Sequence, residues 1–248
     1  MPLNFINVTK IFFKANDRGL TRNTWLNSRH SFSFADYFDG SRVNFGTLCA
    51  LNDDIIRAGT GFGNHPHDNM EIISIPINGA LKHTDSMGHE QIISTNEVQV
   101  MSARTGIFHS EKNASNTEDA NFLQLWIFPN IKNVRPVYNQ KYFDPTDARN
   151  CWQKLVTDID FKNEELLNIH QNALISRSIL DKDFELKYKL RQTSFGCFLF
   201  IVSGAIEIDG EYYTDRDAIG LTNLSEFTIK AIKDSYVLNI EVTTYILN

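Results

Sequence analysis

Four residues in the first half of the chain combine metal-binding side chains with a spacing that could bring them together. His65 and His67 stand two residues apart in GFGNHPHDNMEI, and His109 and Glu111 repeat that spacing in TGIFHSEKN. On an extended strand, side chains at i and i+2 point to the same face. If two such strands are neighbours, three imidazoles and one carboxylate can face one divalent ion. Fe(II), Mn, Ni, Cu and Zn suit these donors and leave positions open for a substrate or O₂.

Both segments also fit longer patterns. The first fits G(X)5HXH(X)3E from Gly59 to Glu71, and the second fits G(X)2H(X)3N from Gly106 to Asn113. The pair resembles the two motifs of the cupin β-barrel. A lone His-x-His is more common in surface turns than in metal sites, so the prediction depends on the joint match. Because the first pattern ends on a glutamate, the residues alone leave open whether Glu71 or Glu111 is the carboxylate ligand.

The remaining sequence predicts an all-β fold in two halves. Short apolar or alternating runs, rich in Ile, Val, Phe and Trp, are broken by Gly, Asn, Asp and Pro, as is typical of a sandwich or barrel. These runs cover residues 44–51, 70–77, 97–103, 122–128, 197–203 and 205–210. The stretch PNIKNVRPVYNQKYFDP, with its three prolines, predicts a linker. We therefore expect a first barrel over 1–135 and a second over 136–248. No histidine follows His170, so the first barrel must hold a histidine site.

Composition limits the function classes. A net charge of −6 disfavours a nucleic-acid binder. The three cysteines, Cys49, Cys151 and Cys197, are far apart and lack CxxC spacing, which indicates thiols in a reducing compartment. We find neither a secretory signal nor a run of about 18 apolar residues, so we expect a cytoplasmic protein that does not enter membranes. The pair Asp53-Asp54 is interpreted as a solvated turn.

Several segments together resemble the pirin family, most closely its shorter bacterial members. They are WLNSRHSFSFADYFD, GTGFGNHPHDNMEI, GALKHTDSMG, VQVMSARTGIFHSEKN and FLQLWIFPN. The resemblance spans nearly the whole chain and implies a bicupin, two stacked cupin barrels, of which only the first holds metal, usually iron. It maps the ligands onto His65, His67, His109 and Glu111. Glu71 would then support the ligands or the barrel.

Other residues are expected near this site. Asp68 and Arg104 depart from the types that relatives often carry there. Asp68 would raise imidazole basicity, and Arg104 would lower it or bind an anionic substrate. Phe62, Phe108 and Met101 could form apolar walls for a planar aromatic substrate, or could equally be core residues. His83 and His89 are expected as a hydrogen-bonded or exposed turn pair, and His30 and His170 as packing or hydrogen-bonding residues.

The resemblance implies a quercetin 2,3-dioxygenase-type activity. The ion, expected to be Fe(II), would hold a deprotonated flavonol oxygen, Glu111 would take the hydroxyl proton, and O₂ would open the ring. The alternative is a non-enzymatic metal or redox sensor, whose metal state changes a surface read by a regulatory protein partner. A cupin isomerase or other small-molecule enzyme is a third hypothesis. The second barrel is expected to be a scaffold, and the protein a monomer.

Overall fold

The computed structural model describes residues 9–103, 105–133, 135–161, 163 and 165–244. Arg104 lies outside these residues. Within them nearly every regular element is a strand, and the helical pieces are two short 3-10 turns, η1 (Ala15–Asp17) and η2 (Pro145–Ala148). The predicted all-β fold is confirmed. Among the residues described, no helix is long and apolar enough to cross a membrane.

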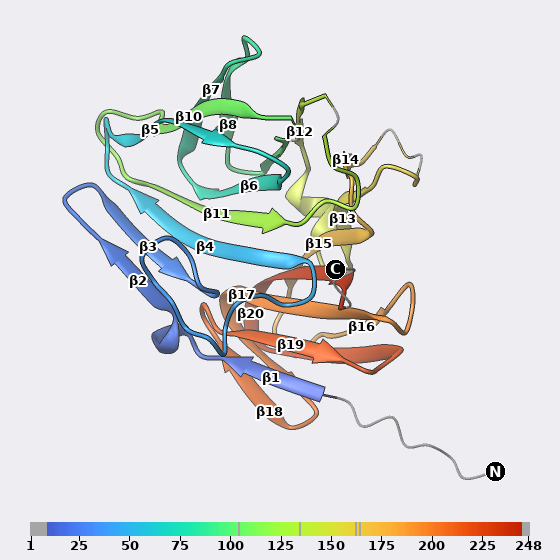
Figure 1. Cartoon of the computed structure of the whole chain (residues 1–248). Coiled ribbons are helices and arrows are strands. Elements are labelled where there is room, and N and C mark those ends of the chain that lie inside the picture. Colours follow the sequence, from blue (N-terminus) through green and yellow to red (C-terminus); the bar gives the residue numbers. More distant parts are fainter. Residues whose placement is uncertain (1–8, 104, 134, 162, 164, 245–248) are drawn as a thin grey trace.

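The first half of the chain forms two antiparallel sheets (Figure 1). The larger sheet has, in spatial order, β12 (Val137–Tyr142), β9 (Glu97–Ser102), β6 (Glu71–Asn78), β11 (Ala120–Ile127), β4 (Leu48–Ile56), β3 (Leu26–His30) and β2 (Gly19–Arg22). The smaller sheet has β5 (Gly61–His67), β10 (Ile107–Asn113), β7 (Ala80–Asp85) and β8 (Glu90–Ser94). Side chains from the facing surfaces of the two sheets pack together, which closes a barrel.

The second half forms one strongly curved sheet. Its main path is β1 (Thr9–Phe13), β19 (Ala218–Thr222), β17 (Phe195–Ile208), β20 (Glu226–Thr243), β15 (Ala173–Leu180), β13 (Gln153–Asp158) and β14 (Leu167–Ile169). Beside this path, β16 (Glu185–Lys189) pairs with β20, and β18 (Glu211–Thr214) pairs with β17. Its interior is filled by apolar side chains such as Leu199, Ile219 and Ile229.

Burial explains why the strands differ in pattern. The larger sheet of the first half lies between the smaller sheet and the second half, so β6 is buried on both faces and reads as a continuous run, EIISIPIN. In contrast, β10 and β7 alternate buried and exposed residues because only one of their faces meets the barrel interior. The inward positions of β10 are Ile107, His109, Glu111 and Asn113.

The largest apolar core lies between the two halves. It joins buried residues of the larger first sheet, such as Leu51, Ile73 and Leu125, to residues of the second half, such as Phe198 and Leu238. The halves are therefore packed face to face and share a core, in addition to the apolar clusters inside each barrel.

Strands also cross the division expected at residue 135. β12 pairs with β9 of the first half, and β1 pairs with β19 of the second half. The predicted linker thus contains a strand. Its prolines, Pro129, Pro136 and Pro145, all lie outside β12, where they interrupt no ladder hydrogen bond. The prolines on either side therefore gave the segment the composition of a linker, although its central residues form a strand.

The two separate apolar runs 197–203 and 205–210 lie on one strand, β17, apart from the last two residues of the second run. Its register shifts near Gly204, which has φ +103°, a conformation that favours glycine. A glycine at positive φ, Gly79 with φ +77°, also separates β6 from β7 in the first half. In each half, a glycine marks the point where the chain bends to continue around the barrel.

The interpretation of Asp53-Asp54 as a solvated turn is wrong. Both residues lie within β4 and are buried. Asp53 accepts hydrogen bonds or ion-pair contacts from Arg18, Asn121 and Arg216, so it ties the first half to the second. Asp54 points the opposite way, toward the interior of the first barrel. Donors around Asp53 on one face and the cavity beside Asp54 on the other accommodate an acidic pair in the middle of a buried strand.

The shared core predicts a large cost for cutting a side chain at its centre. Phe198 is fully buried against Phe13, Phe32 and Phe45, so Phe198→Ala should lower the free energy of unfolding by about 3–5 kcal/mol. Urea titration followed by circular dichroism measures this loss. Phe38→Ala is the matched control, because this ring is 79% exposed and its loss should change stability by less than about 0.5 kcal/mol. Equal effects of the two substitutions would contradict a core shared at Phe198.

Candidate metal centre

Neighbouring strands of the smaller sheet bring the predicted histidines together. β5 and β10 are antiparallel partners, with His65 directly opposite His109 and His67 opposite Ile107. The register shifts between His109 and Glu111, so a β-bulge interrupts the pairing there. Spacing by two along each strand then gives both histidines of β5 the same face as His109.

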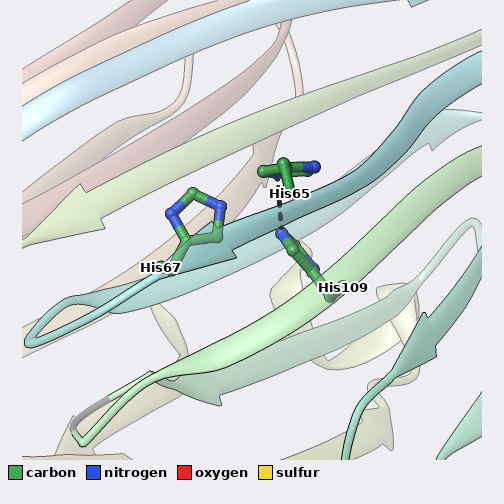
Figure 2. A group of neighbouring side chains, drawn as sticks. All are labelled: His65, His67 and His109. Atoms are coloured by element: carbon green, nitrogen blue, oxygen red, sulfur yellow. Dashed lines mark hydrogen bonds between the residues drawn. The ribbon is translucent and has the colours of Figure 1, made fainter.

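The three rings converge on one point, as Figure 2 shows. One nitrogen from each of His65, His67 and His109 lies within 4.8 Å of the other two, a grouping that could hold a metal ion. The Nε2 atoms of His65 and His109 are 3.0 Å apart, and the His67 ring packs edge-on against Trp126 at 4.9 Å between centroids.

The protonation of His65 suits a ligand role. Its Nδ1 lies 2.8 Å from the carbonyl oxygen of Gly63, so Nδ1 must carry the hydrogen and donate it. In the neutral ring this leaves the lone pair on Nε2, the atom directed at the other histidines. A backbone acceptor that fixes the tautomer is typical of metal-binding histidines.

Burial and mutual repulsion keep two of the rings neutral. Desolvation, followed by the neighbouring histidines, lowers the pKa of His67 from 6.5 to about 4 and that of His109 to about 3. Each cationic ring would be costly beside two others in a shielded site. At neutral pH these imidazoles therefore offer lone pairs without first losing a proton.

Glu111 belongs to a second, overlapping group. Its carboxylate, 1% exposed, groups with His83 and His109 within 4.8 Å. Its Oε1 accepts a hydrogen bond from Ser74 Oγ at 3.1 Å, and its Oε2 accepts one from Gln124 Nε2 at 2.5 Å. Trp126 Nε1 donates to Gln124 Oε1 at 3.1 Å, which orients the amide so that its NH₂ group faces the carboxylate.

His83 is more central than the sequence indicated. It is fully buried, its Nε2 contacts Asp85 Oδ2 at 3.2 Å, and its ring lies 5.3 Å from that of His109. Asp85 Oδ2 also contacts Nδ1 of the partly exposed His89 at 2.8 Å. The alternation of HTD on β7 could have indicated that His83 and Asp85 share an inward face.

Two predicted residues lie elsewhere in the barrel wall. Glu71 is on the face of β6 opposite Ser74, where its Oε2 accepts a hydrogen bond from Ser102 and its Oε1 is 3.9 Å from His170 Nδ1. It therefore faces the second half, away from the three histidines. Met101 is fully buried in an apolar cluster with Ile72 and Ile107.

The remaining predicted residues surround the site on different sides. Phe62 packs against Trp25 and lines a cavity beside the histidines. Phe108 points outward and is 51% exposed, since it is out of phase with His109 on β10. With the exposed Asp68, it lines a wider depression on the outer side of His65 and His67.

A cavity of about 250 Å³ opens beside the imidazoles and between the two sheets. Its walls comprise Thr21, Leu26, Ser28, His30, Phe34, Ala35, Asn52, Asp54, Phe62, His65, His67, Glu111, Gln124 and Trp126. Most of these lie on β2, β3, β4 and β11, far from the histidine motifs in sequence. The motifs therefore could not identify them. His30, expected to form hydrogen bonds, contacts Asn52 Oδ1 at 2.8 Å and Thr21 Oγ1 at 2.9 Å.

Comparison with protein families gives two matches that together cover most of the chain. Residues 13–127 match the family model described as Pirin, and residues 160–242 match the quercetinase C-terminal cupin domain. An Escherichia coli K12 protein named quercetin 2,3-dioxygenase is 37% identical over 225 residues, which are 91% of this chain and 95% of that protein.

Solved structures of bacterial relatives have a similar fold. The crystal structure of the bacterial pirin YhhW from Escherichia coli in complex with nickel(II) superposes with a TM-score of 0.89 at 34% identity, covering 96% of this chain and all of that one. A quercetin 2,3-dioxygenase from Acinetobacter baumannii gives a TM-score of 0.71 at 20% identity, over 96% of this chain and 79% of that one. The latter likeness concerns the fold alone.

The lowered pKa values of His67 and His109 predict how pH affects the metal-free protein. As the pH falls below 6.5, histidines of the unfolded chain take up protons, whereas these two rings stay neutral until about pH 4 and pH 3. The unfolded state then binds more protons, so the free energy of unfolding should fall between pH 6.5 and about 4.

Urea titrations of the metal-free protein across that range measure this effect. His67→Gln/His109→Gln should show a clearly weaker dependence, because glutamine does not titrate. An unchanged slope in the double variant would show that other groups cause the loss of stability.

Proposed function

The chain belongs to the pirin family, and we propose that it is a metal-dependent dioxygenase that opens the ring of a flavonol such as quercetin with O₂. The observation that carries this proposal is the convergence of three imidazoles beside a cavity with aromatic walls. The name and the 37% identity of the Escherichia coli relative support the reaction type.

We assign His65, His67 and His109 as ligands of one divalent ion, with Glu111 as a fourth ligand or as the base beside it. Fe(II) is our proposed ion. Ni, Mn, Cu and Zn suit the same donors, and nickel occupies the related YhhW structure. Neutral rings, a fixed His65 tautomer and a buried carboxylate are the features of this chain that fit such an ion.

The bound ion would act as a Lewis acid that favours the deprotonated form of a substrate hydroxyl. Glu111 can receive the released proton. Gln124 Nε2 can only donate, so Oε2 remains an acceptor. Ser74 Oγ can accept a hydrogen bond as well as donate one. The transferred proton would therefore reside on Oε1, which would then donate to Ser74. Through this asymmetry, Gln124 and Ser74 orient the base, while Phe34, Phe62 and Trp126 limit access of water to the cavity.

Metal binding tests the ligand assignment directly. Titration calorimetry with Ni²⁺ on metal-free protein should give one site per chain. His109→Ala should weaken this site by at least about 100-fold, because it removes a ligand that both candidate groups share. Asn64→Ala is the control: this exposed residue adjoins His65 on β5, and its removal should leave affinity unchanged. Comparable affinity in His109→Ala would contradict the assignment.

Oxygen consumption tests the reaction. The Fe(II)-loaded protein should consume O₂ over many turnovers with quercetin, and His65→Ala/His67→Ala should abolish this. Glu111→Gln should lower turnover by about 100-fold or more, because the proton acceptor is lost. Absence of O₂ uptake by wild-type protein that holds iron would reject the dioxygenase proposal. It would favour a protein whose metal state is read by a regulatory partner.

We further propose that the protein is a cytoplasmic monomer. Its three cysteines are all free thiols, which supports a reducing compartment.

A further inference from the structure

Asp54 is an acidic side chain inside the first barrel that the proposed reaction does not use. It lies on β4, paired with Ser28 of β3 and Phe122 of β11, and it lines the cavity beside the histidines. The side chain is 2% exposed. Its strand neighbour Asp53 points to the opposite face, where it is surrounded by arginine and asparagine donors.

The Asp54 carboxyl group has spare hydrogen-bonding capacity. Its Oδ1 has no hydrogen-bond partner among the described residues, whereas both oxygens of Glu111 have donors. Burial raises the pKa of Asp54 to about 7, the Ser28 hydroxyl acts against this, and Asp53 and Glu111 add to it. A buried polar atom without a partner is destabilising, and a ligand group that bonds to it would recover that loss.

The neighbouring polar groups of the cavity wall already have partners. His30 contacts both Thr21 and Asn52, and Gln124 links Trp126 to Glu111. Asp54 therefore stands out among these cavity residues as a group able to bond a ligand without breaking an existing contact.

We propose that Asp54 is a specificity-determining residue, which binds a hydroxyl group of the aromatic ligand remote from the oxygen that meets the metal. This inference rests on the proposed function. It deepens that function by naming the ligand class: aromatic molecules with two separated polar ends.

The barrel supplies the required separation. Gln124, which bonds Glu111, is paired with Asn52, two residues along β4 from Asp54. Diagonal neighbours of this kind are about 7–8 Å apart in an antiparallel sheet. A ligand that reaches from the histidines past Glu111 to Asp54 must therefore be longer than a single small functional group. A flavonol has this form, because its metal-binding hydroxyl is on the fused rings and further hydroxyls are on the pendant ring.

Ligand binding to the zinc-loaded protein tests this without turnover, since Zn²⁺ has no redox chemistry. Quenching of tryptophan fluorescence, with Trp126 in the cavity wall, reports binding of quercetin and of galangin, which lacks hydroxyls on the pendant ring. Wild-type protein should bind quercetin about tenfold more tightly than galangin. Asp54→Leu and the smaller Asp54→Ala should reduce this ratio to about one by weakening quercetin alone. Asp54→Asn, which keeps the polar group, should retain most of the preference.

Ile55→Ala is the matched control, because this half-exposed neighbour on β4 points away from the barrel interior. It should leave both affinities unchanged. Equal affinities in the wild type, a preference that survives in Asp54→Leu and Asp54→Ala, or an equal loss of both ligands would each overturn the role of Asp54 and leave the dioxygenase proposal standing. Zinc-loaded wild type that binds neither flavonol would overturn both proposals.

Discussion

Burial of the Glu111 carboxylate is the constraint around which the first barrel is organised. Removing such a group from water is costly unless hydrogen bonds replace the lost hydration. Ser74 and Gln124 provide them, and they can do so together because they are directly opposite each other on β6 and β11. The buried carboxylate thus requires hydrogen-bond donors on two strands of the facing sheet.

The polar residues occupy a belt between two apolar clusters. Along β6 and β11 the inward residues run from Ile72 to Ser74 and from Trp126 through Gln124 to Phe122. Apolar packing on both sides of the belt keeps the barrel closed although its middle is polar. The second half has an apolar cluster inside instead, and it covers the back of the larger sheet. The polar belt thus lies in the first half, and the second half packs against the sheet that carries part of it.

The sequence was sufficient for elements governed by local pattern. Strands such as β6 and β11 follow from apolar runs, and the i, i+2 spacing places His65 with His67. It was insufficient where the role of a residue depends on a partner that is far away in the sequence. Asp53-Asp54 has the composition of a turn, and only Arg18 and Arg216 on one face and the barrel interior on the other make it a strand. Likewise, the sequence places His83 near a turn, and only the pairing of β7 with β10 sets it opposite Glu111.

The pairing of β1 with β19 has a consequence for folding. Thr9 lies opposite Thr222, so β1 pairs with a strand that follows it by about 210 residues in the sequence. Contacts between residues that are so far apart in the sequence form slowly. Since β1 also covers an edge of the second sheet, that edge stays open to other chains until β1 docks. β1 therefore cannot take its place until β19 has been synthesised, and its docking is the step that completes this edge of the second sheet.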